Sequence, residues 1–93
     1  MNLSALCQIK VNFTEADFWL IRRGTLTAVG KPVREFYREH IGIKVIQTEI
    51  LLPDYLFYVF LDFHNRGLFK ALALGTLPLV HIRVEDIKNI QIG

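Results

Sequence analysis

The segment that decides the fold is residues 53–92, which read PDYLFYVFLDFHNRGLFKALALGTLPLVHIRVEDIKNIQI. Its first two residues, Pro53-Asp54, predict a helix start, because proline fits the first helical turn and aspartate favours the positive end of the helix dipole. Apolar side chains then point in nearly every direction as far as residue 65. This pattern predicts one long apolar helix that is buried on most sides or shared with a partner.

The rest of the segment predicts smaller elements in a fixed order. Gly67 interrupts or caps the first helix, and residues 68–74 form a second helical piece that ends at Gly75-Thr76 and Pro78. Residues 80–83 alternate as a strand. Glu85-Asp86 then precede a short C-terminal helix with Ile87 and Ile90 on one face, and residues 91–92 close the chain.

The first half of the chain predicts strands. Residues 8–13 alternate between polar and apolar, residues 18–21 form a wholly apolar run that suits a strand covered on both faces, and residues 41–50 alternate most clearly. Residues 33–37 are a further candidate strand, after an ordered loop over 25–32. We therefore expect an α+β fold with a small mixed sheet, one long apolar helix and a short C-terminal helix, in a single domain over 1–93.

Composition indicates how the protein forms its core and in which cellular compartment it is expected. The 93 residues are 52% hydrophobic, enough for a core without disulfides or metals, and a core this rich in so short a chain leads us to expect an oligomeric or partner interface. Cys7 is the only cysteine, so no internal disulfide can form and we expect a reducing compartment. Its apolar neighbours predict that its side chain is buried. The first residues lack a signal-peptide pattern and residues 55–61 are too short to span a bilayer, so we expect a cytoplasmic protein.

No motif for catalysis emerges from the sequence. The histidines His40, His64 and His81 lie in three separate predicted elements, and no metal-ligand spacing occurs. Gly24 and Gly30 are not followed by the Lys-Ser/Thr ending of a phosphate-binding loop and are better explained by turn geometry. We therefore expect no enzyme activity and no cofactor.

Positive charge is concentrated in one part of the chain. Residues 22–44 hold six Lys or Arg against two glutamates, although the net charge is only +2. Arginine forks hold phosphates or read guanine edges, and threonine hydroxyls bond phosphates, which makes DNA binding the leading hypothesis. An ordinary solvated surface, with Arg22 or Arg23 paired to an acid, is the alternative. The candidate DNA-binding residues are Arg22, Arg23, Thr25, Thr27, Lys31 and Arg34, with Lys70, Thr76 and Arg83 as further contacts.

Three segments, in order, resemble a known family. Residues 17–25 (DFWLIRRGT) with 29–31 (VGK), residues 51–60 (LLPDYLFYVF), and residues 73–76 (ALGT) with 81–92 (HIRVEDIKNIQI) are similar to motifs of target recognition domains. These domains belong to the DNA-specificity subunits of type I restriction-modification systems. The resemblance implies a target-recognition fold, non-catalytic DNA binding, and methyltransferase or restriction subunits as partners.

The chain departs from that family pattern, since it contains neither a second recognition domain nor a helical spacer. We expect a short, single-domain relative in which a homodimer would restore two-fold reading of DNA. A relative that keeps the fold without DNA binding is equally open. The alternative function is a small protein-interaction or regulatory module that oligomerises through its apolar helix.

Overall fold

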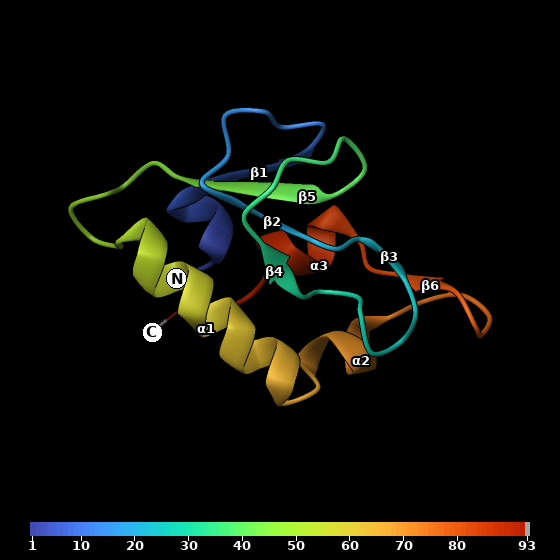
Figure 1. Ribbon diagram of the computed structural model, residues 1–93. Coiled ribbons are helices and arrows are strands. Elements are labelled where there is room, and N and C mark those ends of the chain that lie inside the picture. The colour runs from blue at the N-terminus through green and yellow to red at the C-terminus, as the bar shows by residue number, and fades with distance from the viewer. Residues whose placement is uncertain (93) are drawn as a thin grey trace.

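A computed structural model of the chain describes residues 1–92 (Figure 1). Within them a four-stranded sheet runs in the order β1-β5-β2-β4, and a two-stranded sheet pairs β3 with β6. The strands are β1 (Cys7–Val11), β2 (Phe18–Leu20), β3 (Arg23–Gly24), β4 (Pro32–Val33), β5 (Ile41–Val45) and β6 (Val80–His81). The helices are the 3-10 turn η1 (Leu3–Ala5), α1 (Pro53–Asn65), α2 (Leu68–Leu72) and α3 (Val84–Lys88).

The α+β class predicted from the sequence is confirmed, but the sheet is not mixed. Every strand pairing in residues 1–92 is antiparallel. The central strand β5 joins β1, with Ile9 opposite Ile43, to β2, with Phe18 opposite Ile43. Antiparallel strands can be joined by short loops, whereas parallel strands need a long crossover connection. An antiparallel sheet therefore suits a chain of this length.

The two faces of the sheet are covered differently. On one face, alternate residues of β1, β2 and β5 enter the main core, among them Ile9, Phe18 and Ile43, and the helices cover them (Figure 1). On the other face the indole of Trp19 is buried and donates a hydrogen bond to the Phe13 carbonyl at 2.8 Å. The apolar run of β2 is therefore covered on both faces, as its sequence predicts.

Helix α1 is less apolar around its circumference than predicted. Leu56 and Phe60 are fully buried, whereas Tyr55 and Tyr58 on the opposite side are 63% and 61% exposed. The prediction of a helix buried on most sides is therefore wrong, because tyrosine carries a polar hydroxyl that a water-facing position satisfies. α1 packs with one face on the sheet and leaves a partly apolar face in solvent.

Gly67 separates α1 from α2, as predicted. Its φ of +84° places it in the left-handed region, and its amide donates to the His64 carbonyl at 3.1 Å. This geometry closes the last turn of α1, and only glycine adopts it without strain. α2 starts at the next residue and ends at Leu72, two residues earlier than predicted, because Leu74 leaves the helix to pair with His81.

Several strands are shorter than predicted because tertiary contacts take their hydrogen-bonding groups. Alternation continues to Ile50, but β5 stops at Val45, since the amides of Ile46 and Gln47 both donate to the Leu6 carbonyl. β4 ends at Val33 rather than continuing to Tyr37. The strand predicted over 80–83 is reduced to β6, because Arg83 caps α3. The short C-terminal helix is confirmed, although Glu85-Asp86 lie inside its first turn rather than before it.

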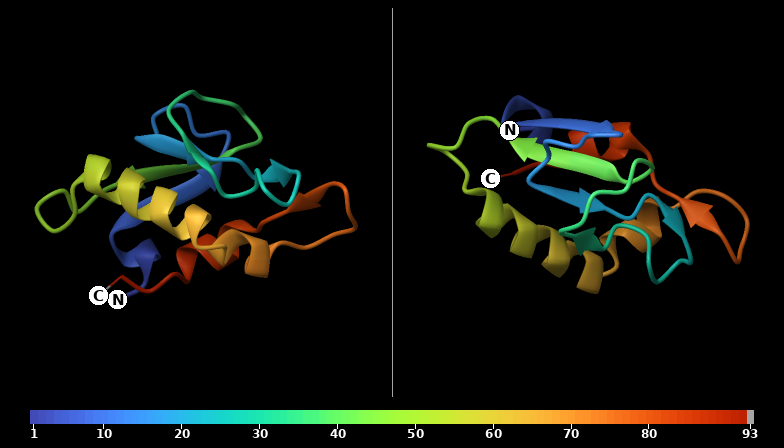
Figure 2. Two further views of the ribbon diagram at one scale, coloured as in Figure 1. Left: turned by 60° about the horizontal axis from the view of Figure 1, so that its bottom comes forward. Right: turned by 45° about the horizontal axis from the view of Figure 1, so that its top comes forward.

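The two ends of the described chain lie side by side (Figure 2). Asn2 and Gln91 form an antiparallel bridge, and the Ile92 amide donates to the Met1 carbonyl at 2.9 Å. Ile87 is fully buried and Ile90 is partly buried against the core, which confirms the predicted apolar face of α3. The closing segment therefore stabilises the N-terminal turn as well as its own helix.

Two glycines with nearly equal φ values give a matched test of the packing. Gly30 has φ +82°, and a Cβ there would lie 2.1 Å from Cγ of Phe69; Gly67 has φ +84° and open space around it. Gly67→Ala introduces only backbone strain, about 1 kcal/mol, whereas Gly30→Ala adds a clash with a buried ring and should lose about 3 kcal/mol or more. Urea unfolding monitored by the Trp19 fluorescence measures both. Equal losses would show that Phe69 does not pack against Gly30.

Candidate nucleic-acid interface

A short β-structure projects from one end of the molecule. We call it the arm; it consists of residues 23–24 and 74–81 (right side of Figure 1). Arg23 lies opposite His81 and Gly24 opposite Val80, and Leu74 bridges His81 on its other side. The Leu74 and His81 backbones exchange hydrogen bonds of 2.8 and 2.9 Å. His81 thus sits in the middle of three short antiparallel segments, which hold the loop 75–79 away from the core.

The turn over residues 25–30 lies beside the arm and is fixed from several sides. The Thr25 carbonyl accepts from the amides of Ala28 and Val29, and the Gly30 amide donates to the Ile21 carbonyl at 2.8 Å. From α1, Nε2 of His64 donates to the Thr27 carbonyl at 2.8 Å. A turn held this firmly presents its side chains at little further entropic cost.

Six of the nine candidate residues gather at this end. The arm, the turn 25–30 and α2 together make what we call the arm end; Phe69 of α2 packs against Gly30 of the turn. Each of the six gathered side chains is exposed: Arg23, Thr25, Thr27, Lys31, Lys70 and Thr76. The hydroxyls of Thr25 and Thr27 lie 3.3 Å apart. These residues come from separate parts of the chain, and the pairing of β3 with β6 brings them to one end.

The other three candidates are tied into the fold. The Nε of Arg22 donates to the Glu39 carbonyl at 2.9 Å, and the Arg22 carbonyl accepts from the Ile82 amide. Arg83 makes two hydrogen bonds of 3.1 Å to the Asp86 carboxylate. The alternative predicted that Arg22 or Arg23 would pair with an acid, whereas Arg22 is held by a backbone carbonyl; the surface ion pair is made by Arg83 instead.

Arg34 lies away from the arm end. Its guanidinium stacks over the Phe57 ring, 3.9 Å from the ring centre, and its Nη1 is 3.4 Å from Oδ1 of Asp54. Both partners belong to α1, so the side chain of Arg34, the residue after β4, points toward that helix. This cation–π contact accounts for the position of Arg34. The expectation that Arg34 would lie in the basic loop region with Arg22 and Arg23 depended on closeness in sequence, and the structure places it elsewhere.

Charge is segregated along the molecule. The segments of the arm end, residues 23–31, 68–72 and 74–81, contain Arg23, Lys31 and Lys70 and no acidic residue. Residues 45–65, which include α1, contain Glu49, Asp54 and Asp62 and no Lys or Arg. Because the charged side chains at the arm end are all positive, the electrostatic potential there is positive. A polyanion that approaches the protein is therefore attracted to the arm end.

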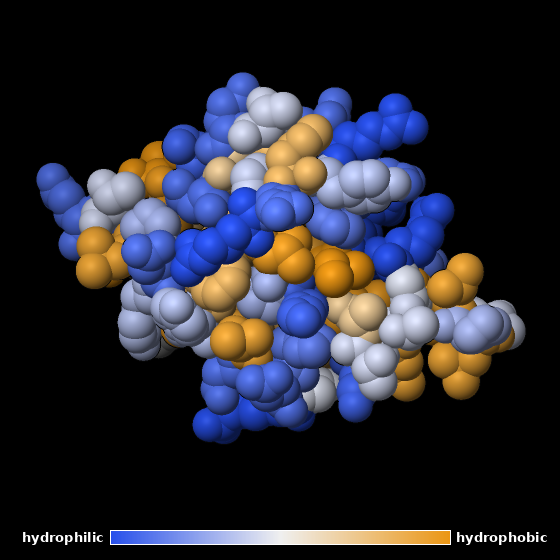
Figure 3. All heavy atoms as spheres, viewed as in Figure 1, coloured by the Kyte–Doolittle hydropathy of each residue, from blue (hydrophilic) through white to orange (hydrophobic). Residues whose placement is uncertain are grey.

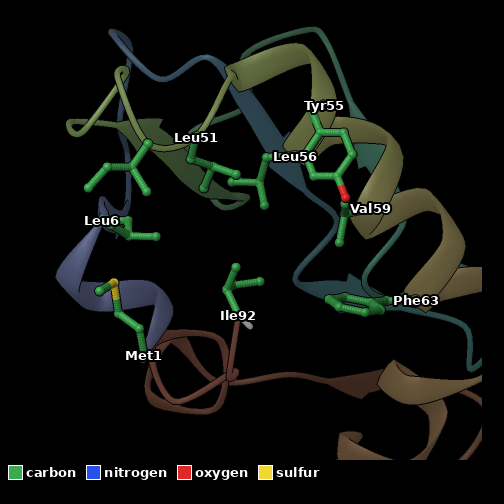
Figure 4. A pocket seen from close by; sticks show the side chains of 9 residues that line it. Met1, Leu6, Leu51, Tyr55, Leu56, Val59, Phe63 and Ile92 are labelled. Carbon is green, nitrogen blue, oxygen red and sulfur yellow. The ribbon is translucent and has the colours of Figure 1, made fainter.

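The opposite end carries an apolar groove. It has a volume of about 620 Å³ and lies between η1, the loop before α1, α1 itself and the C-terminal segment (Figure 4). We call this site the groove. Its lining residues are Met1, Leu6, Ile50, Leu51, Tyr55, Leu56, Val59, Phe63 and Ile92. Such a surface suits an apolar partner and offers little to a phosphate.

Burial shifts the pKa of two side chains in the described residues, Cys7 and His40. Cys7 is buried, and burial together with the nearby Asp17 charge raises its pKa to about 11, which keeps the thiol protonated and inert near neutral pH. His40 packs against the Tyr37 ring at 4.9 Å, and burial lowers its pKa. Within residues 1–92, no group of three or more His, Cys, Asp or Glu side chains is placed to hold a metal ion.

No helix in the described part of the chain has both the length and the apolar character needed to cross a membrane.

The sequence patterns did not predict that the loop of the arm exposes apolar side chains. Leu74, Leu77 and Leu79 are all exposed there, and they flank Gly75 and Pro78. A signal was present, because leucines in a turn-forming stretch have few neighbours to bury them. The same reasoning missed the exposed aromatic residues Phe36 and Tyr37, which follow Arg34 in the loop between β4 and β5.

Comparison with known proteins identifies the fold. No protein-family model matches the sequence. No curated protein matches it either. Among solved structures, the chain is similar to the S subunit of a type I restriction-modification system from M. genitalium, with a TM-score of 0.72 and 15% sequence identity over 97% of this chain. The chain spans 32% of the length of that subunit. The fold implied by the sequence resemblance is therefore confirmed.

Proposed function

We propose that this protein is a non-catalytic DNA-binding module whose arm end contacts the duplex. The observation that carries the proposal is the segregation of charge: the segments that build the arm end contain three exposed cations, Arg23, Lys31 and Lys70, and no acid. The likeness in fold to part of a type I restriction-modification S subunit supports the same function. Methyltransferase or restriction subunits as partners, a cytoplasmic location and a homodimer that reads both half-sites belong to this proposal as well.

The side chains take different parts in such a complex. Arg23, Lys31 and Lys70 are exposed cations that can each neutralise a phosphate, and the hydroxyls of Thr25, Thr27 and Thr76 can donate to phosphate oxygens. Arg83 reaches a phosphate only in competition with Asp86. Arg22 acts as a positioning residue, because its contacts with Glu39 and Ile82 fix the base of the arm. Arg34 adds a contact only where bound DNA extends toward α1.

Replacement of two free cations tests the proposal. Arg23→Ala with Lys31→Ala should weaken binding to a short duplex and reduce the slope of log K against log salt by about 1 for each phosphate that is no longer neutralised. Fluorescence anisotropy across a salt series measures both quantities. Lys10→Ala is the matched control, because Lys10 is an exposed cation on β1, outside the arm end. Equal effects of the two variants, or no measurable binding by the parent protein, would contradict the proposal.

A second candidate function rests on the groove. A module that oligomerises through α1 would bring a second copy onto the exposed apolar side chains around the groove, among them Ile50, Leu52 and Tyr55. Apolar surface of this kind on a small protein is typical of an interface.

Light scattering with Ile50→Lys and Tyr55→Lys tests this alternative. If α1 and the groove form the interface, the parent protein should scatter as a dimer and the double variant as a monomer. The two positions are exposed, so the melting temperature of the variant should change little. A parent protein that is monomeric at every concentration would exclude the groove as a self-association site.

A further inference from the structure

The tip of the arm exposes a cluster of apolar side chains. Leu77 is 66% exposed, Leu79 is 61% exposed and Leu74 is 40% exposed, and Pro78 lies between the first two. Figure 3 shows apolar residues at the right end of the molecule, where the arm projects. Each leucine left in water forgoes about 1.5–3 kcal/mol of burial free energy, so an apolar cluster on a projecting loop favours contact with a partner.

The fold holds this tip in place. Leu74 and His81 pair through two backbone hydrogen bonds, and His81 lies opposite Arg23 in β3. Gly75, with φ +110°, turns the chain at the point where it leaves the pair, and a Cβ there would lie 3.5 Å from the Leu79 carbonyl oxygen. The leucines therefore lie on a loop that projects from the core and is held in place by backbone hydrogen bonds at its base.

The charges behind the tip favour a nucleic acid as its partner. Residues 67–84 contain Lys70 and Arg83 and no acidic residue, and Arg23 lies at the base of the loop. A duplex offers phosphates on its rim and an apolar surface between stacked base pairs. Leucine and proline are among the side chains that enter a base step as wedges, next to cations that hold the backbone.

We propose that Leu77-Pro78-Leu79 acts as an apolar wedge that enters a base step of the bound duplex and bends it, while Arg23 and Lys70 hold the flanking phosphates. This inference rests on the DNA-binding function proposed above and adds the mode of binding. A wedge partly unstacks one step and lets the duplex fold toward the arm end. Sequence preference then comes in part from the ease of opening that step, since pyrimidine–purine steps deform most readily.

The test compares two sets of exposed leucines. Short duplexes carrying 2-aminopurine at successive positions, with donor and acceptor dyes at their ends, report unstacking and bending. Wild-type protein should raise the 2-aminopurine emission and shorten the end-to-end distance. Leu77→Ser with Leu79→Ser should abolish both signals and weaken binding on the order of tenfold, while the salt slope stays unchanged. Ile46→Ser is the matched control, because Ile46 is 54% exposed and follows β5, outside both the arm end and the groove lining.

The outcomes separate this inference from the DNA-binding proposal. Binding that depends on Arg23 and Lys31 but shows no unstacking, no bending and no loss in the Leu77/Leu79 variant would overturn the wedge and leave DNA binding intact. A parent protein that binds no duplex would overturn both. Leu77→Phe, which keeps a large apolar side chain at the tip, should retain the unstacking signal.

Light scattering identifies the competing role for the tip. A parent dimer that dissociates in the Leu77→Ser, Leu79→Ser variant, with DNA affinity preserved, would identify the tip as a protein interface and overturn the wedge. Unchanged circular dichroism and melting temperature should accompany the variant in every case, because both leucines are exposed.

Discussion

The buried ring of Phe60 is the contact on which the arrangement of the elements depends. It lies 5.8 Å from the Phe18 ring of β2 and is stacked 6.0 Å from the Phe69 ring of α2. Phe69 in turn fills the space that Gly30 leaves by having no side chain. One chain of aromatic contacts therefore joins the sheet, both helices of the α1–α2 pair and the turn beside the arm. The position of the cations at the arm end follows from this packing.

Local sequence signals predicted the elements that local chemistry controls. Pro53 starts α1, Gly67 ends it, and the apolar run of β2 is covered on both faces. The ends of β5 and β4 could not be predicted from alternation alone. The Leu6 carbonyl accepts from the amides that follow Val45, so a residue about forty positions away in the sequence determines where β5 ends.

The candidate site was predicted in part for the same reason. Of the basic loops predicted around residues 22–34, Arg23 and Lys31 lie at the arm end, and only the tertiary packing of α2 and β6 brings Lys70 and Thr76 beside them. The helix predicted to be buried on most sides has a solvent face with two tyrosines, and the only sequence signal for the exposed leucines of the arm is their place in a turn-forming stretch. Apolar residues are usually buried, and exceptions to this rule are expected at functional surfaces. Sequence patterns that assume burial therefore do not predict them.

The two ends of the molecule are chemically distinct. The arm end combines cations, threonine hydroxyls and an apolar tip, whereas the groove is lined by apolar and aromatic side chains. A polyanion and an apolar protein partner would therefore bind at opposite ends without competition. Under the proposed function, this division separates the DNA contact from a protein interface.

Amide chemical shifts, recorded while a short duplex is added at low salt, test whether DNA binds at the arm end. We expect shift changes concentrated in residues 23–31, at Lys70 and over 74–83, with little change over 46–62. Changes concentrated over 46–62, or a spectrum unaffected by DNA, would contradict DNA binding at the arm end.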